Sequence, residues 1–493
     1  MFRFYSGVSQ KLDRLLTRAA PKQSRGREGA VRRLLKHTGI LFFSFSCVLT
    51  LAAEPADWIW SGRYVITMDA QRRVIENGAV AVRADRIAGV GSKAEIDKRF
   101  QAAQRLDRPD AILAPGLINT HTHAAMALFR GLADDLTLQD WLNKFIFPAE
   151  AKNVSAEFVR WGTRLGVVEM LLGGTTTFTD MYYFEDVVAE VAREAGMRGV
   201  LGETIIGFPV ADAKTPADSL RFTEGYLQRF RNDALVTPAV APHAIFTNSD
   251  ETLKAARALA NKYSAPLIIH LSETKKENDD ELAKRHATPT KALDALGVFN
   301  GRTVAAHCVW VSDADMAILK MRGVGVAHNP SSNTKLASGV APVTRMRAMG
   351  IAVGLGTDGP AGSNNDLNLF EEMDLAVKLQ NVTALNPQAL AAAAALEMAT
   401  LGGARVLGLE RQIGSLEAGK RADLISVRID RPNAVPLYNP VSQMVYALKA
   451  EDVRDVMVNG KPVVRDAQIL TLDAKQILQK AAEYRVRVTT SLK

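Results

Sequence analysis

Residues 111–131 read AILAPGLINTHTHAAMALFRG, an apolar run that ends in two histidines one residue apart. Histidine is scarce in this chain, with 8 among 493 residues. A short, continuous apolar run is typical of a buried strand in a parallel sheet. Side chains alternate between the two faces of a strand, so His121 and His123 would share a face and could bind one ion together.

Seven further apolar runs follow, with helical patterns between them. Residues 155–173 and 249–263, for example, repeat apolar side chains at the i, i+3, i+4 and i+7 spacing of an amphipathic helix. Eight such units over roughly 300 residues predict an α/β fold, a (β/α)8 TIM-like barrel, whose chemistry gathers at the carboxyl ends of the strands. The eight runs are 111–123, 174–181, 197–206, 235–246, 265–273, 302–310, 323–333 and 351–359.

The chain is β-rich on both sides of the predicted barrel. Residues 57–91 alternate short β-rich runs with turn signals such as Asn77-Gly78, and residues 414–466 return to this pattern with a hairpin turn at Asn459-Gly460. We therefore expect one small composite β-sandwich domain built from both chain ends. The expected boundaries are 1–53 for a signal peptide or N-terminal extension, 54–112 and 412–470 for the two parts of the β-sandwich, 113–411 for the barrel and 471–493 for a C-terminal helix.

The N-terminal segment has the parts of a secretory signal peptide. Basic residues at 32, 33 and 36 precede GILFFSFSCVLTLAA (39–53), an uncharged apolar run that ends in small residues. This pattern predicts an exported, periplasmic protein cleaved near Ala53; an uncleaved anchor and a cytoplasmic extension are the alternatives. Only Cys308 would remain after cleavage, so no intramolecular disulfide is expected.

The formal net charge of +8 is confined to this segment. Residues 1–53 hold ten Lys/Arg and two acidic residues; taking these from 61 and 53 leaves 51 of each sign in the rest of the chain. A neutral body requires no nucleic-acid partner, and no membrane contact beyond an N-terminal anchor. The expected partners are a small-molecule substrate and further copies of the chain in a homo-oligomer.

Most of the scarce histidines fall at the ends of the apolar runs, and Asp358 ends the eighth. His121, His123, His270 and Asp358 together offer three imidazoles and one carboxylate. These ligands suit a single divalent ion, Zn²⁺ or as second choice Fe²⁺, with a position left for water. Bound zinc would lower the pKa of that water toward about 7. The histidines at run ends are His121, His123, His243, His270, His307 and His328.

Glu273 lies three residues after His270, in the stretch HLSET. On a straight strand its side chain would face away from that of His270, so the chain must bend for Glu273 to reach the barrel mouth. A carboxyl group at the mouth could carry a proton from water to a substrate nitrogen.

Five stretches of this chain, in the order in which they occur, resemble motifs of the amidohydrolase superfamily. More narrowly, they are similar to its aminohydrolase branch of 5′-methylthioadenosine/S-adenosylhomocysteine deaminases, which has triazine and guanine hydrolases as relatives. The stretches are PGLINTHTHAAM, GGTTTFTDMY, IHLSET, AAHCV and GTDGPAGSNNDLNLFEEM. The resemblance covers about residues 57–466. It implies a metal-bearing barrel with a composite β-sandwich, and a hydrolase that acts on C–N bonds of cyclic amidines.

The resemblance also implies roles for individual residues. His121, His123, His270 and Asp358 would bind one metal ion, and Asp358 would also act as base toward the bound water. Glu273 would be the proton shuttle to the ring nitrogen, and His307 would orient the attacking hydroxide. The predicted substrate contacts are Glu150, which would accept hydrogen bonds from ribose hydroxyls, His243, Glu273 and Asp358.

The resemblance also places three further positions around the site. Trp141 matches a lid-like segment, and His328 with Asn329 would shape the wall. Where some adenosylhomocysteine deaminases carry an arginine that holds the substrate carboxylate, this chain has Glu203. A carboxylate there should repel an anionic tail, which argues against adenosylhomocysteine as substrate.

Three functions are therefore compatible with the sequence. The first is hydrolytic deamination of an adenine-type nucleoside, with release of ammonia. The second is aminohydrolase or chlorohydrolase chemistry on another N-heterocycle, such as guanine, a pterin or a triazine. The third is a non-catalytic exported binding protein, and the intact set of ligands and shuttle argues against it.

Overall fold

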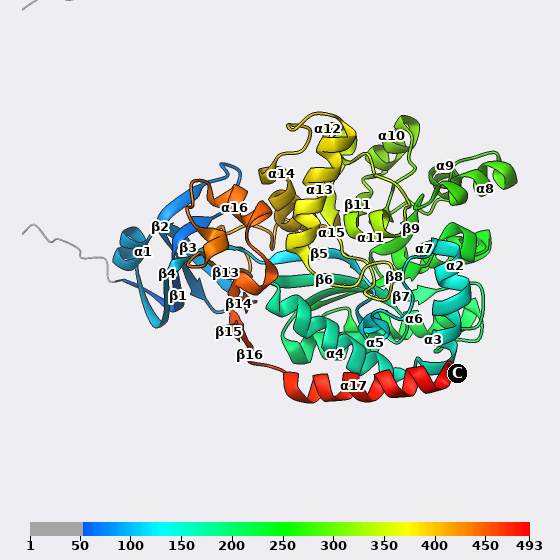
Figure 1. The fold of residues 1–493 in the computed structure, drawn as a ribbon, viewed down its shortest axis with the longest axis horizontal. Coiled ribbons are helices and arrows are strands. Elements are labelled where there is room, and N and C mark those ends of the chain that lie inside the picture. The colour runs from blue at the N-terminus through cyan, green and yellow to red at the C-terminus, as the bar shows by residue number, and fades with distance from the viewer. Residues whose placement is uncertain (1–52) are drawn as a thin grey trace, which may run out of the picture. The chain divides into compact units, whose positions relative to one another are not determined.

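Two eight-stranded sheets organise residues 53–493, the part of the chain that the computed structural model describes. In Figure 1 the blue and orange segments, which come from the two ends of the described chain, lie together beside the barrel. The predicted signal segment lies outside the described residues, except for Ala53. No helix within residues 53–493 is both long and apolar enough to cross a lipid bilayer.

The central sheet is a parallel barrel whose strands follow one another in chain order. Its first and last strands meet through a parallel bridge between Thr122 and Asp358, and Thr120 Oγ1 donates a hydrogen bond of 2.8 Å to the Leu355 carbonyl. All eight predicted runs supply a strand, so the predicted barrel is confirmed. The strands are β5 (Leu117–Thr122), β6 (Thr175–Tyr182), β7 (Arg198–Ile205), β8 (Val236–Pro242), β9 (Leu267–Leu271), β10 (Thr303–His307), β11 (Gly325–His328) and β12 (Val353–Leu355).

Amphipathic helices connect these strands. Ser155 and Ser249 begin two of them as N-caps, since their side chains accept hydrogen bonds from Phe158 N and Thr252 N. The two predicted helical segments are therefore confirmed as α4 and α7. The connecting helices are α4 (Ala156–Leu172), α5 (Glu185–Ala195), α6 (Pro216–Phe230), α7 (Asp250–Lys262), α8 (Lys275–Arg285), α9 (Pro289–Ala295), α10 (Asp313–Arg322), α11 (Pro330–Lys335) and α12 (Val343–Ala348). After the last barrel strand come α13 (Leu369–Thr383), α14 (Ala392–Glu397) and α15 (Gly403–Leu407), and α16 (Pro440–Tyr446) lies between two strands of the second sheet.

A helical segment between β5 and α4 adds to the barrel mouth. It consists of α2 (Leu138–Asp140), a π-helical turn at Trp141–Ile146 and α3 (Phe147–Asn153). The predicted C-terminal helix is confirmed as α17 (Ala474–Ser491), drawn in red along α4 in Figure 1. Its last residue reaches α3, where Ser491 Oγ donates a hydrogen bond of 3.0 Å to Asn153 Oδ1.

The second sheet combines both ends of the described chain, as predicted. Its strands form one continuous hydrogen-bonded sheet, in which β4 pairs antiparallel with β13. Trp60 and Leu113 from the N-terminal half share a hydrophobic core with Leu424 and Met457 from the C-terminal half. The strands, with α1 (Lys93–Arg99), are β1 (Glu54–Ile66), β2 (Val74–Arg83), β3 (Arg86–Ser92), β4 (Phe100–Pro115), β13 (Leu424–Arg428), β14 (Val453–Val458), β15 (Lys461–Arg465) and β16 (Gln468–Ile469).

The opening apolar run is shared between the two sheets. Residues 111–115 end β4 and residues 117–122 form β5, with Gly116 between them. A Cβ at Gly116 would lie 2.1 Å from Thr176 Oγ1, so only glycine fits where the chain crosses from one sheet to the other.

The two predicted Asn-Gly turns have different outcomes. Asn459 and Gly460 have φ of 51° and 78° and connect β14 to β15, as expected for a tight hairpin turn. Asn77 and Gly78 instead lie inside β2, so the turn prediction there is wrong. A Cβ at Gly78 would lie 2.5 Å from Val65 Cγ2, so close packing against β1 explains this glycine.

Candidate metal centre and catalytic pocket

His121, His123, His270 and Asp358 form a buried group at the carboxyl end of the barrel. One ligand atom from each residue lies within 4.8 Å of the others. Asp358 Oδ1 is 3.2 Å from His123 Nε2 and 3.4 Å from His121 Nε2. The barrel thus brings His270 and Asp358, which are remote in sequence, to the neighbouring pair His121 and His123, as predicted.

Closure of the barrel places Asp358 beside the histidine pair. Its backbone N–H donates a hydrogen bond of 3.0 Å to the His121 carbonyl, and its φ of 62° turns the chain sharply after β12. Gly356 permits this close approach, because a Cβ there would lie 2.9 Å from His121 Cβ. A non-glycine residue with positive φ is uncommon and tends to occur at functional sites.

Hydrogen bonds orient two of the imidazole rings. His123 Nδ1 lies 2.6 Å from the Met181 carbonyl oxygen, and His270 Nδ1 lies 2.9 Å from the His243 carbonyl oxygen. Each carbonyl accepts the Nδ1 proton, which leaves the Nε2 lone pair for a metal ion. Asp358 is held in turn by Ser332, whose Oγ donates to Oδ2 at 2.7 Å.

The environment of the group fits a cation. Both ring nitrogens of His121 are buried and have no hydrogen-bond partner within residues 53–493. Burial lowers the pKa of His121 to about 4 and that of His270 well below its usual value, so both rings are neutral. Burial opposes protonation of His123 as well, but the hydrogen bond and charge of Asp358 raise its pKa to about 9. A bound cation would replace this proton as the partner of Asp358.

Glu273 and His307 lie together next to this group. His307 Nε2 is 3.8 Å from Glu273 Oε2, and His307 Nδ1 is 2.9 Å from Asn333 Oδ1. Asn329 Nδ2 lies 3.2 Å from the same ring nitrogen. Burial raises the pKa of Glu273, so this carboxyl group keeps its proton to a higher pH than an exposed one and can serve as a proton donor.

A cavity with an empty volume of about 610 Å³ opens onto the group and contains the predicted substrate contacts. Glu150 lines it from α3, and the Tyr182 hydroxyl donates a hydrogen bond of 2.6 Å to Glu150 Oε1. Burial raises the pKa of Glu150 to about 7 and lowers that of His243, also on the wall, to about 3. Trp141 lines the cavity too, and its indole N–H donates to the Ala361 carbonyl at 2.9 Å.

Glu203 does not line this cavity, so the prediction that its charge repels an anionic tail is wrong. Its side chain is fully buried, and its Oε2 accepts a hydrogen bond of 2.9 Å from the backbone N–H of Glu185 at the start of α5. Neighbouring Thr204 lines the cavity instead, because adjacent strand residues point to opposite faces.

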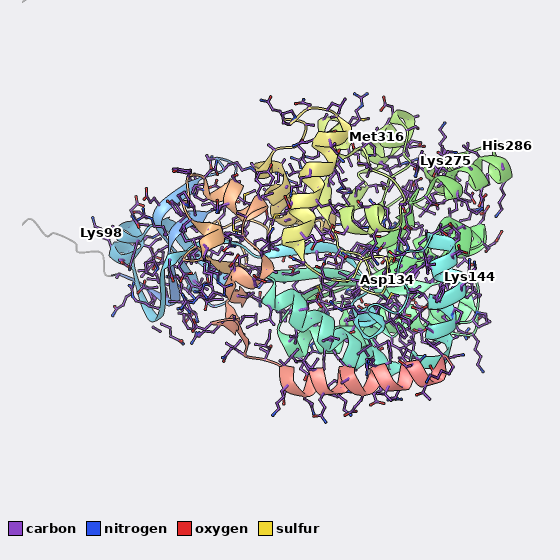
Figure 2. All side chains as sticks on the ribbon, in the orientation of Figure 1. Lys98, Asp134, Lys144, Lys275, His286 and Met316 are labelled. Carbon is purple, nitrogen blue, oxygen red and sulfur yellow. The ribbon has the colours of Figure 1, made fainter. Side chains whose placement is uncertain are left out.

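Two further histidines lie outside the cavity wall. His328 is 1% exposed at the end of β11, and it is not among the residues that line the cavity. His286 is exposed at the end of α8, and Figure 2 shows it at the periphery of the molecule. Asn329, beside His328, supports the His307 ring instead of the wall.

The sequence interpretation missed the residues that hold the reactive side chains. Ser332 supports Asp358, Asn333 supports His307, and Tyr182 supports Glu150. Each support comes from a different strand or helix than the residue it holds. Hydroxyl, amide and phenol groups are too common in sequences to signal such contacts without the fold.

Comparison with known proteins agrees with this geometry. The model of the "Amidohydrolase family" matches residues 112–463. The chain belongs to this family. Over 440 residues it is 46% identical to a protein from Syntrophus aciditrophicus named 5-methylthioadenosine/S-adenosylhomocysteine deaminase 1. The alignment covers 89% of this chain and 99% of that protein.

Solved structures show the same fold. An adenosine deaminase from Xanthomonas campestris with bound zinc superposes with a TM-score of 0.87 and 39% identity, over 89% of this chain and all of the other. An atrazine chlorohydrolase from Arthrobacter aurescens complexed with zinc has a TM-score of 0.80 at 24% identity, over 87% of this chain and 100% of that one. At that identity the likeness extends to the fold alone.

Proposed function

We propose that this amidohydrolase is a hydrolytic deaminase of adenine-type nucleosides: 5′-methylthioadenosine, S-adenosylhomocysteine or adenosine itself. The proposal rests on one observation: the group of four candidate ligands, the buried Glu273 and the buried Glu150 all border the same cavity. Similar proteins with deaminase names, at 46% and 39% identity, support it.

We propose zinc as the ion. Three imidazoles and one carboxylate are a common zinc ligand set, although Fe²⁺ suits the same donors. A divalent ion held by His121, His123, His270 and Asp358 would lower the pKa of a water molecule toward about 7 and supply hydroxide at neutral pH.

The chain's own residues would carry the protons. Asp358 would accept the proton of the attacking water, and the His307 ring would orient that water toward the ring carbon bearing the amino group. Glu273 would protonate the adjacent ring nitrogen as the new C–O bond forms. Asp358 would then give its proton to the amino group, so that the C–N bond breaks and ammonia leaves. The new hydroxyl would return a proton to Glu273, which leaves a keto purine and restores both carboxyl groups, so water and substrate account for every atom of the products.

The other end of the cavity would hold the ribose. The Glu150 carboxylate can accept hydrogen bonds from the two ribose hydroxyls, and the Tyr182 hydroxyl holds it in place. His243, neutral at its lowered pKa, could donate or accept one hydrogen bond to the substrate. Ammonia release from purine nucleosides, guanine, pterins and triazines would test the substrate class, because only nucleosides carry the diol that Glu150 is proposed to bind.

Glu150→Gln should mainly raise KM for nucleosides and leave kcat on a free base nearly unchanged. The substitution removes the charge that strengthens hydrogen bonds to the diol, a difference of about 1 kcal/mol or more per bond. Steady-state kinetics on adenosine and on its 2′,3′-dideoxy analogue would measure the effect. If the substitution raises KM equally for both substrates, Glu150 does not bind the diol.

The pH dependence of kcat/KM offers a second test of Glu150. Its pKa is raised to about 7, so the charged form is present above this pH and lost as the pH falls through it. We expect kcat/KM for nucleosides to fall as the pH drops below about 7, and Glu150→Gln to remove this limb of the profile. An identical limb in the variant would assign the titration to another group.

We also propose that the protein is exported. The basic and apolar pattern of residues 32–53 supports this, and cleavage near Ala53 would begin the mature chain at Glu54. N-terminal sequencing of protein recovered outside the cytoplasm should read EPADWIW. Recovery of uncleaved protein from the cytosol alone would contradict the proposal.

A further inference from the structure

Glu277 is a buried carboxyl group with no role in the steps above. Its side chain is 4% exposed near the start of α8. Its Oε1 accepts a hydrogen bond of 2.9 Å from the backbone N–H of Ser272, and its Oε2 accepts one of 2.8 Å from the backbone N–H of Glu273. One carboxylate therefore binds two successive N–H groups in the turn between β9 and α8.

These bonds go beyond ordinary helix capping. In a capping box, the side chain at the third helical position accepts from the N–H of the N-cap residue. Thr274 is the N-cap of α8, and its Oγ1 accepts from Glu277 N at 3.2 Å. The Glu277 side chain instead reaches past Thr274 to the two residues before it, so its partners belong to the turn that carries Glu273.

This turn decides where Glu273 points. Ser272 has a φ of 49°, a conformation that residues other than glycine rarely adopt. Its carbonyl accepts hydrogen bonds from Val309 N at 3.0 Å and Trp310 N at 2.9 Å. Ser272 is thus held by Glu277 on one side and by the loop after β10 on the other, and the reversal sends Glu273 into the cavity beside His307.

We propose that Glu277 is a positioning residue for the reaction. It holds the Ser272–Glu273 turn in its unusual conformation and so sets the Glu273 carboxyl group against the substrate ring. This inference rests on the proposed function, because it gives Glu273 the role of proton shuttle. Glu277 itself is neither one of the four grouped ligands nor among the residues that line the cavity.

Glu277→Gln tests the inference. The amide has one acceptor oxygen, and its NH₂ group would face the second backbone N–H, so one of the two bonds must be lost. We expect kcat to fall by about 10- to 100-fold, the scale of an angstrom-size misplacement of a reacting group, with KM and metal content near wild type. Glu281→Gln is the matched control, since Glu281 is 2% exposed on the same helix but pairs with Arg285; its kcat should be unchanged.

A double-mutant cycle separates positioning from general destabilisation. If Glu277 acts through Glu273, then Glu273→Gln/Glu277→Gln should be no slower than Glu273→Gln alone, because the shuttle is already absent. Additive losses would overturn the inference. So would wild-type kcat in a folded, metal-loaded Glu277→Gln enzyme, or a loss of kcat explained by lost metal.

Glu277→Asp keeps the inference testable if the Gln variant does not fold. The shorter side chain keeps a carboxyl group but cannot reach both N–H groups at once, so a smaller fall in kcat with unchanged KM is expected, and no fall would overturn the inference. The two proposals fail differently. An inactive Glu273→Gln enzyme with a normal Glu277→Gln enzyme overturns the positioning role alone, whereas an active Glu273→Gln enzyme overturns the proposed shuttle and the inference together.

Discussion

Glu273→Gln should lower kcat by about 10²-fold or more while the protein keeps its fold and its metal. Gln has the shape of Glu but no titrating proton, and Glu273 is not one of the four grouped ligands. Because proton delivery strengthens in the transition state, kcat and kcat/KM should fall together. Steady-state kinetics on the best nucleoside substrate, with metal content measured on the same sample, would show this.

Two outcomes would contradict this prediction. Wild-type turnover in Glu273→Gln would mean that another group supplies the proton. A fall in kcat matched by loss of metal would mean that Glu273 supports the metal site instead of the proton transfer. Glu281→Gln again serves as the control for removal of a buried carboxylate from this part of the barrel.

His121→Ala should abolish metal binding and activity together. Both ring nitrogens of His121 lack any other partner within the described chain, so the substitution removes one ligand and breaks no other hydrogen bond. Removal of a side chain that hydrogen-bonds a metal ligand already costs about 10- to 100-fold in metal affinity, and loss of a ligand should cost more. Elemental analysis should find one divalent ion per wild-type chain and much less in the variant.

Thermal unfolding gives a readout of metal binding that does not depend on activity. Added Zn²⁺ should raise the Tm of metal-stripped wild type, because the ion binds the folded chain, and should raise that of His121→Ala far less. His286→Ala, which removes an exposed histidine far from the pocket, should behave as wild type. Two ions per wild-type chain, or full metal in His121→Ala, would show that the four-ligand site is wrongly assigned.

The barrel could be predicted from the sequence because its signal is local and repeated. Each strand is a short apolar run, and each run is separated from the next by a helical pattern. The four-residue group that fits a metal ion could be predicted for a related reason. His121, His123, His270 and Asp358 all end such runs, and parallel strands in a barrel bring their carboxyl ends to one mouth.

The errors arose where contacts between remote segments outweigh local pattern. Asn77-Gly78 has the composition of a turn, yet packing of Gly78 against Val65 keeps it within a strand. Glu203 lies near the end of β7, which runs toward the mouth, yet its side chain faces the start of α5 and not the cavity. The alternation of side chains along a strand could not decide this direction, because the sequence alone does not fix which residues of β7 face the barrel interior.

The sequence by itself determined the fold class, the chemical nature of the candidate metal ligands and the residue types proposed for proton transfer. Only the tertiary structure decided which way Glu273 points, since that depends on the positive φ of Ser272 and on the hydrogen bonds from Glu277. It likewise decided that Ser332, Asn333 and Tyr182 hold the reactive groups. The periodicity of a strand or helix can be read from neighbouring residues. A hydrogen bond between remote side chains, in contrast, depends on a short distance that arises only after distant segments have packed together.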